Sequence, residues 1–244
     1  MKIGILIPST SNGRNWTGFK ESYLYQFTLK SFLLTYDKEH EYVFYIGIDR
    51  GDRIYDSPDA VNQFRRFLTI APSTRVEFLY MDEIAKGHLT RMWNLLFKKA
   101  HDDGCEYFYQ CGDDIRFCTK GWVNDSIKTL EFQPDRLGMT GPINNNPRIL
   151  TQSFVSRKHM DLFGYYFPEE LLNWFCDDWI NDVYKGLNRF FPLTAHFCEN
   201  LGGMPRYHIN NDSNFQAGFF EKKRKLSEQC AEIVSRDLAR ASYV

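Results

Sequence analysis

The stretch Glu106–Phe117, EYFYQCGDDIRF, decides the fold of this chain. It opens with the strand-forming run Tyr107–Tyr109, breaks at Gly112 and continues with two adjacent carboxylates, Asp113 and Asp114. A buried strand that ends in this way delivers oxygen ligands to the carboxyl edge of a sheet, where open α/β folds bind their ligands. Carboxylate oxygens suit Mg²⁺ or Mn²⁺, and these ions in turn hold phosphates. The same residues also fit a plain acidic turn, because Asp favours turns, so the rest of the chain has to decide.

Strand and helix patterns alternate on the N-terminal side of this stretch. Short apolar runs indicate strands, and apolar residues at helical spacing indicate helices. The predicted strands cover 2–8, 42–48 and 75–80, and the predicted helices cover 19–36, 57–71 and 87–100. This alternation predicts an α/β fold in which a mostly parallel central sheet carries helices on both faces.

The C-terminal side reads as a smaller half with mixed elements. Helices are predicted over 122–132 and 174–184, a helical region opens at 167–170, and strands are predicted over 137–142, 150–156 and 189–196. The segment 201–214 is rich in loop-forming residues, and 215–241 is charged and fits a surface helix or a tail. No repeat or linker divides the sequence, so we expect one domain over 1–244.

Composition excludes several classes of protein. The 244 residues are 43% hydrophobic and carry a net charge of −1, which allows a substantial core but no basic field for nucleic acid. The six cysteines form no CxxC pair and no zinc spacing. The apolar N-terminal run meets Pro8 at once, and no apolar stretch approaches the length of a membrane span. We therefore expect a soluble, cytoplasmic protein with free thiols and no nucleic-acid partner.

A second acidic pair, Asp177 and Asp178, follows in the predicted helix 174–184. It fits an exposed helix face, but Trp174 and Trp179 make its surroundings apolar. Two separate acidic sites are what transfer of a sugar from a nucleotide diphosphate requires. A metal held by carboxylates stabilises the departing diphosphate as a Lewis acid, and a further carboxylate takes the proton of the acceptor hydroxyl.

Several motifs occur in an order that resembles the GT-A glycosyltransferases, close to the family 2-like group of nucleotide-diphospho-sugar transferases. The matching segments lie within 2–196 and are KIGILIPST at the start, Asp49 after the second strand, the run Gly87, Arg91, Asn94 and Ala100, then EYFYQCGDD, CDDW at 176–179 and GLNRFFPLTAH at 186–196. The resemblance implies a GT-A fold. It divides the domain into a nucleotide-sugar-binding half (1–118), an acceptor and catalytic half (119–212) and a C-terminal helix or tail (213–244).

The resemblance also implies roles for individual residues on the donor side. The donor would be bound by Pro8, Ser9, Thr10, Asp49, Arg91, Asn94 and Asp113. A Mn²⁺ or Mg²⁺ ion would be held by Asp114, with Asp113 directed toward the ribose or the metal and His196 as a further ligand. His208 is the alternative histidine.

On the acceptor side, the resemblance implies that Asp178 is the catalytic base, with Asp177 as the alternative, and that Trp174 and Trp179 contact a carbohydrate or glycan acceptor. Apolar surroundings would raise the pKa of the base toward neutrality. The implied activity is metal-dependent transfer of a sugar from a nucleotide-diphospho-sugar, with UDP as the favoured carrier, and with inversion at the sugar carbon. A retaining course stays open.

Two other functions compete with this interpretation. A nucleotidyltransferase would carry a glycine-rich basic loop after the first strand, and the segment 9–18 has one arginine and no glycine cluster. The other alternative is an inactive module that binds a carbohydrate or a nucleotide sugar.

Overall fold

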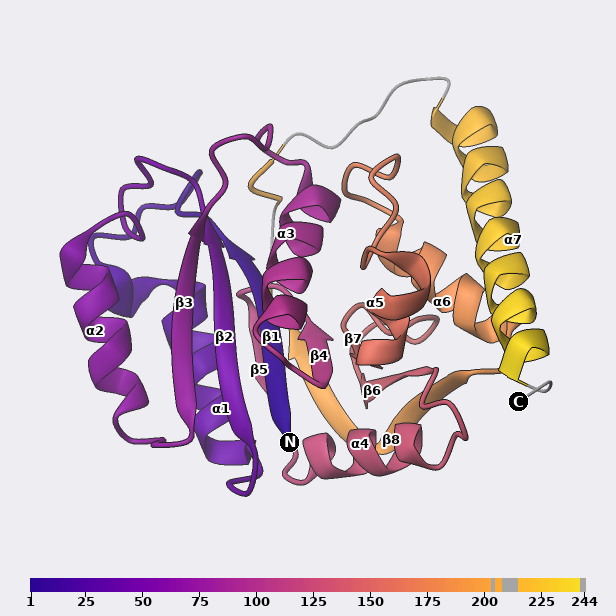
Figure 1. Cartoon of the computed structure of the whole chain (residues 1–244). Coiled ribbons are helices and arrows are strands. Elements are labelled where there is room, and N and C mark those ends of the chain that lie inside the picture. The colour runs from indigo at the N-terminus through magenta and orange to yellow at the C-terminus, as the bar shows by residue number, and fades with distance from the viewer. Residues whose placement is uncertain (203–204, 208–214, 242–244) are drawn as a thin grey trace.

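The computed structural model describes residues 1–202, 205–207 and 215–241. Its centre is an eight-stranded sheet of order β3-β2-β1-β4-β7-β6-β8-β5 (Figure 1). The strands are β1 (Lys2–Ser9), β2 (Glu41–Ile48), β3 (Thr74–Tyr80), β4 (Tyr107–Gln110), β5 (Ile115–Phe117), β6 (Met139–Ile143), β7 (Ser153–Ser156) and β8 (Phe190–Asn200). The pairs β1·β2, β1·β4, β2·β3 and β6·β8 are parallel, and β4·β7, β6·β7 and β5·β8 are antiparallel. Only β5 and β7 therefore run against the other strands, and the prediction of a mostly parallel sheet is confirmed.

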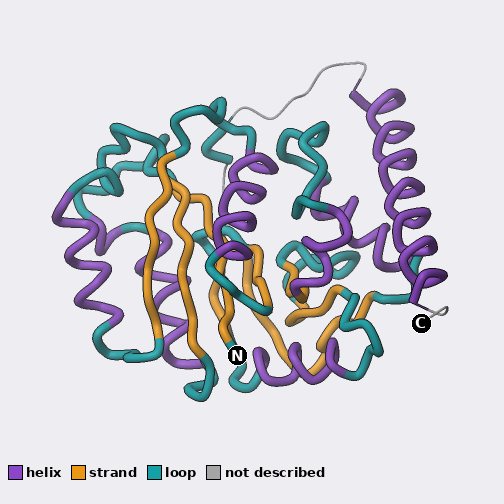
Figure 2. The backbone as a smooth tube through the Cα atoms, viewed as in Figure 1, coloured by secondary structure: helices purple, strands orange, loops and turns teal. Residues whose placement is uncertain are grey.

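Helices cover both faces of the sheet, as predicted. Side chains of β1 alternate between the two faces, so Ile3, Ile5 and Ile7 pack on one side and Leu6 on the other. The first face is covered by a π-helix η2 (Leu24–Leu29), α1 (Lys30–Thr35), α2 (Pro58–Leu68) and α4 (Trp122–Glu131). The second face is covered by α3 (Leu89–Asp102), α5 (Arg157–Phe163), α6 (Cys176–Gly186) and α7 (Phe215–Ala241). Figure 2 shows this layering as purple helices on either side of the orange strands.

The predicted helix 19–36 is interrupted. A short 3-10 helix, η1 (Phe19–Glu21), ends at Ser22, whose backbone is extended at φ −65° and ψ 151°. The Ser22 hydroxyl donates to the carbonyl of Phe19 at 2.7 Å. This local bond offers the backbone an alternative to continuing the helix. The chain resumes as η2 and α1, where the hydroxyls of Thr28 and Ser31 accept the amide protons of Ile115 and Phe117.

The second half differs more from its prediction. No helix opens at 167–170; instead α5 precedes this segment, and Gly164 ends α5 in the left-handed region at φ 74°. The side chain of Asn94 binds the backbone of Tyr166 and Phe167, which commits that backbone to contacts outside any helix. Strand β7 starts three residues later than predicted because Asn181 takes both backbone groups of Leu150.

The helix α7 agrees with the predicted surface helix over 215–241. Figure 1 shows it as a yellow rod beside α5 and α6, at the end of the molecule opposite α2. None of the helices in the described ranges combines the length and the apolar character that a bilayer span requires.

Candidate active site

A cavity of about 630 Å³ lies at the carboxyl edge of the sheet, where β1, β2 and β4 end. Its walls come from the turns after these strands, from the start of α3, from the 173–178 segment and from Arg206 and Tyr207. The position follows from topology, because the loops of neighbouring parallel strands open a crevice at their carboxyl ends.

The ends of β1 and β2 form one wall of the cavity. Pro8, Ser9, Thr10 and Asp49 all line it, where donor-binding residues are expected. Burial raises the pKa of the Asp49 carboxyl, while Lys86 and the Thr10 hydroxyl lower it. The buried Asp52 fixes this turn by accepting the Thr10 hydroxyl at 3.2 Å and the amide of residue 11 at 2.7 Å.

The acidic turn after β4 separates its two carboxylates. Asp114 lines the cavity, whereas Asp113 is fully buried and binds the guanidinium of Arg206 through both of its oxygens. The Nη1 atom of Arg206 lies 2.7 Å from Oδ2 of Asp113 and 3.0 Å from the carbonyl of Thr10. Asp113 therefore holds an arginine at the edge of the cavity, and the structure does not bring it to a ribose or a metal as the sequence predicted.

The Asp114 carboxylate is confined between two glycines. A Cβ atom at Gly112 or at Gly202 would overlap one of its oxygens, so both positions need glycine while the side chain keeps this place. Burial and the neighbouring Asp113 raise the pKa of Asp114, against the charges of Arg206 and Arg14. A buried carboxylate with a raised pKa gains stability from a cationic ligand.

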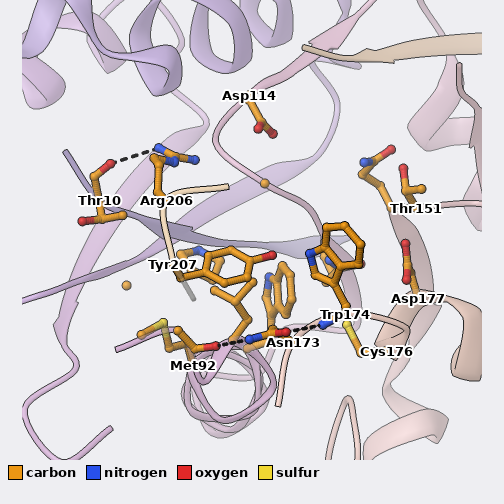
Figure 3. Close-up of a pocket in the computed structure, with 18 of the residues that line it drawn as sticks. Thr10, Met92, Asp114, Thr151, Asn173, Trp174, Cys176, Asp177, Arg206 and Tyr207 are labelled. Carbon is orange, nitrogen blue, oxygen red and sulfur yellow. Dashed lines mark hydrogen bonds between the residues drawn. The ribbon is translucent and has the colours of Figure 1, made fainter. Parts of the chain in front are cut away.

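The second acidic pair lies on the opposite wall, in the first turn of α6. Phe175 precedes the helix in the left-handed region at φ 67°, an uncommon conformation for a non-glycine residue. Asp177 and Asp178 both line the cavity, and the Asp178 amide donates to Oδ1 of Asp177 at 3.0 Å. Burial and the Asp178 charge raise the pKa of Asp177 to about 6. Figure 3 shows Asp114 and Asp177 reaching the cavity from different sides.

Three buried polar atoms in the cavity wall lack a hydrogen-bond partner within the described part of the chain. They are the Ser9 hydroxyl, the Trp93 indole nitrogen and the Thr151 hydroxyl. Buried polar groups in proteins are almost always paired. The wall therefore fits a polar ligand that supplies both donors and acceptors.

Two solved structures of S. aureus TarS share this architecture. The first matches with a TM-score of 0.52 and 16% identity over 81% of this chain and 36% of that chain. The second, described as TarS 1-349 in complex with UDP, matches with a TM-score of 0.53 and 15% identity over 82% of this chain and 60% of that one. The chain has the GT-A fold. No family model and no curated protein matches the sequence.

Within this GT-A fold, Arg206 and Tyr207 are site residues that sequence reasoning did not identify. Burial raises the pKa of Tyr207 to about 12, and the Trp174 side chain acts in the opposite direction. The only signal for Arg206 is that no other lysine or arginine occurs between residues 190 and 221. Lys86, Gln110, Arg148 and Gln152 also line the cavity without having been predicted.

Two residues expected at the donor lie outside the cavity wall. Arg91 forms an ion pair with Glu169 at 2.9 Å, in a half-exposed position. The Asn94 amide binds the backbone of the 166–167 turn at 2.8–3.0 Å. The structure therefore differs from both expectations: these side chains hold the turn beside α3 and do not line the cavity.

Trp174 and Trp179, both predicted to contact the acceptor, lie in different surroundings. Trp174 is 44% exposed and lines the cavity, whereas Trp179 is fully buried in the core beneath α6. Residues five apart lie on different faces of a helix and its entry turn, and here one faces the cavity and the other faces the sheet. Trp179 is therefore a core residue.

The predicted histidine ligand is directed elsewhere. His196 pairs with Oδ2 of Asp125 at 2.9 Å through Nε2 and with the Thr119 hydroxyl at 3.2 Å through Nδ1. Both ring nitrogens are thus occupied by α4 and the turn before it, and His196 is absent from the cavity wall. The alternative, His208, lies outside the described residues.

The described residues contain no cluster of three or more His, Cys, Asp or Glu side chains that could hold a metal by itself. With Asp113 bound to Arg206, Asp114 is the carboxylate that the acidic turn offers to the cavity. Mg²⁺ commonly binds through one or two carboxylates together with substrate phosphates. The residues therefore fit a cation that enters with a diphosphate and is held by Asp114.

Proposed function

We propose that the chain is a glycosyltransferase that moves a sugar from a nucleotide-diphospho-sugar, with UDP as the favoured carrier, to a hydroxyl of a carbohydrate or glycan. The observation that carries this proposal is the arrangement of two acidic groups around one cavity. Asp114 stands at the end of β4, and Asp177 and Asp178 stand across the cavity at the start of α6. The resemblance of the sequence and the fold shared with a protein solved in complex with UDP support the same class of donor.

The donor would extend along the carboxyl edge of the sheet. Asp49 would accept a hydrogen bond from the base or ribose, beside the Ser9 and Thr10 turn. The diphosphate would then lie near Asp114 and Arg206, because a guanidinium held from behind by a buried carboxylate presents a fixed positive charge. A Mn²⁺ or Mg²⁺ ion bound with the diphosphate would add Lewis-acid stabilisation of the leaving group, and Asp114 would hold it.

The acceptor hydroxyl would approach from the α6 side. Asp178 is the proposed base, with Asp177 as the alternative, and displacement by an activated hydroxyl would invert the sugar carbon. A base works best when its pKa lies near the operating pH, and the pKa of Asp177, raised to about 6, meets this condition. Asparagine variants of the two residues keep the shape of the side chain and decide between them.

A nucleotide-sugar screen tests the proposal. Thermal unfolding is recorded with a panel of nucleotide sugars, with Mn²⁺ or with EDTA, since a ligand that binds the native state raises its apparent stability. We expect a UDP-sugar to raise Tm, and release of UDP to follow when an acceptor is present. The Asp178→Asn variant should bind the donor normally yet lose transfer by a factor of roughly 10²–10⁴.

Other outcomes separate the competing functions. A chain that binds the donor but never releases UDP is an inactive binding module. Binding of a nucleoside triphosphate with release of pyrophosphate identifies a nucleotidyltransferase. If no nucleotide sugar changes Tm under any condition, the proposed function is wrong.

A further inference from the structure

A second cavity of about 400 Å³ lies beside the first, between the 169–174 turn and the start of α7. We propose that this cavity, called the α7 cavity, binds the part of a neutral oligosaccharide acceptor that extends beyond the reacting sugar. The inference rests on the proposed function and adds the class of acceptor and the place where it binds. The α7 cavity is lined by Glu169, Glu170, Leu172, Asn173, Trp174, Gly218, Phe219 and Lys222.

The α7 cavity adjoins the first. Asn173 and Trp174 line both cavities, and the acidic pair of α6 begins three residues after Trp174. Asn173 holds this shared wall in place by donating to the carbonyl of Gly87 at 2.9 Å and accepting the Trp174 amide at 2.7 Å. Figure 3 shows Trp174 and Asn173 at the same side of the first cavity as Asp177. A chain molecule whose end lies at the acidic pair can therefore continue past Trp174 into the α7 cavity.

The boundary between α6 and α7 gathers exposed apolar side chains. Trp174 is 44% exposed, Leu172 41% and Phe220 47%. The ring of Phe175 links them, since its centroid lies 6.4 Å from that of Trp174 and 5.8 Å from that of Phe220. An aromatic surface that faces solvent beside a catalytic cavity marks a ligand site. Sugar rings present C–H faces that stack on such rings.

The charges around the α7 cavity cancel. The negative charges of Glu169 and Glu170 are matched by the positive charges of Arg91, which pairs with Glu169 at 2.9 Å, and of Lys222, whose Nζ lies 3.5 Å from the backbone carbonyl of Glu170. The wall thus has polar groups that can bind hydroxyls, but it has no basic field that would attract a polyanion. A neutral oligosaccharide, with hydroxyls at its edges and apolar faces, matches this combination better than a phosphorylated or sulfated one.

Gly218 keeps the α7 cavity open. A Cβ built on it meets no described atom within 4 Å, although the residue lies inside a long helix where glycine is unfavourable. A larger side chain at this position would project into the open space without displacing the backbone. The glycine therefore gives a direct way to fill the cavity.

The test measures oligosaccharide binding and UDP binding separately. Neutral trisaccharides (maltotriose, cellotriose and chitotriose) and an anionic heparin fragment are titrated in the presence of UDP, with calorimetry or tryptophan fluorescence as the readout. We expect at least one neutral trisaccharide to bind. Gly218→Trp, which fills the cavity, and Phe219→Ala, which removes an aromatic ring from its wall, should each weaken binding about tenfold or more, the usual effect of losing a central contact. Gly218→Ala and Phe132→Ala are the matched controls, because Phe132 is 88% exposed at the distant end of α4. Neither control should change the affinity.

Three results would overturn the inference: no neutral trisaccharide binds, the heparin fragment binds more tightly, or Gly218→Trp and Phe219→Ala bind like the wild type. UDP affinity distinguishes this failure from failure of the proposed function, because the altered residues do not line the first cavity. All variants should keep the wild-type affinity for UDP. If UDP does not bind at all while the trisaccharide result follows the α7 cavity, the transferase proposal falls and the oligosaccharide site stands.

Discussion

Replacement of Arg206 by alanine should destabilise the protein more than loss of any exposed ion pair. Arg206 leaves 13% of its side chain exposed and its partner Asp113 none, so the variant would leave a buried carboxylate without its counter-charge. Removing one partner of a buried pair costs about 3–5 kcal/mol. Loss of the bond to the Thr10 carbonyl adds about 1 kcal/mol.

The expected loss converts into a measurable shift in Tm. For a domain of this size, each kcal/mol lowers Tm by roughly 2–4 °C. The total loss of about 4–6 kcal/mol should therefore lower the Tm of Arg206→Ala by roughly 8–24 °C. The double variant Asp113→Ala/Arg206→Ala should recover part of this loss, because it no longer buries an uncompensated charge. The coupling energy of the pair is the difference between the summed losses of the two single variants and the loss of the double variant.

Urea unfolding of the wild type, the two single variants and the double variant measures this cycle. Arg50→Ala is the matched control, since Arg50 pairs with Asp82 while 60% and 45% of the two side chains stay exposed. Exposed pairs contribute about 0–1 kcal/mol. The reasoning would be refuted if Arg206→Ala cost no more than Arg50→Ala, or if the effects of the two single variants simply added.

Three further predictions concern the cavity and its support. Asp114→Ala should abolish the Mn²⁺-dependent rise of Tm with UDP while leaving the unliganded protein as stable as the wild type, because the removed carboxylate is buried at an unfavourable, raised pKa; equal Tm shifts in variant and wild type would contradict this. If Asp177, the alternative to Asp178, is the base, the transfer rate should fall as the pH drops through about 6, because protonation of Asp177 would remove that base, and a pH profile that is flat from about 5 to 7 would exclude Asp177 from that role. Trp179→Ala should lower the free energy of unfolding by about 3–5 kcal/mol as a core truncation, whereas a selective loss of acceptor affinity at unchanged stability would restore Trp179 to the site.

The N-terminal half of the fold was predictable because β1, β2 and β4 are buried on both faces and the strands alternate with amphipathic helices. Strands β1, β2 and β3 start and end within two residues of their predicted positions. The stretch Glu106–Phe117 contains two strands, β4 and β5, separated by the acidic turn after Gln110. Local pattern and tertiary packing agree in such units, so periodicity alone locates them.

The second half was less predictable because asparagine side chains there form hydrogen bonds with backbone groups that would otherwise pair within a strand or a helix. Asn181 takes the backbone groups of Leu150, and Asn94 takes those of the 166–167 turn. These bonds join residues 31 to 73 positions apart. Local periodicity does not reveal such contacts. The start of β7 was therefore misplaced, and a helical region was predicted at 167–170 where the structure has α5 at Arg157–Phe163 instead.

Residues of the candidate site were also predictable where a local pattern places them, and unpredictable where a long-range contact does. Residues that end a strand or begin a helix, such as Thr10, Asp49, Asp114 and Asp177, were predicted and do line the cavity. Arg206 was not predicted because it reaches Asp113 from 93 positions away, through a segment without periodicity. His196 was misassigned because a motif gives a residue type at a strand, but not the side of the sheet toward which the ring points.

The divergent directions of Asp113 and Asp114 have a consequence for how the sequence can vary. The carboxylate at position 113 is tied to one arginine inside the protein, whereas the carboxylate at position 114 faces the cavity. A change at 113 is therefore tolerable only with a compensating change at 206, so these two positions should covary among homologous chains. The residue at position 114 is constrained by the ligand in the cavity, so it should be substituted only in homologous chains that bind a different ligand.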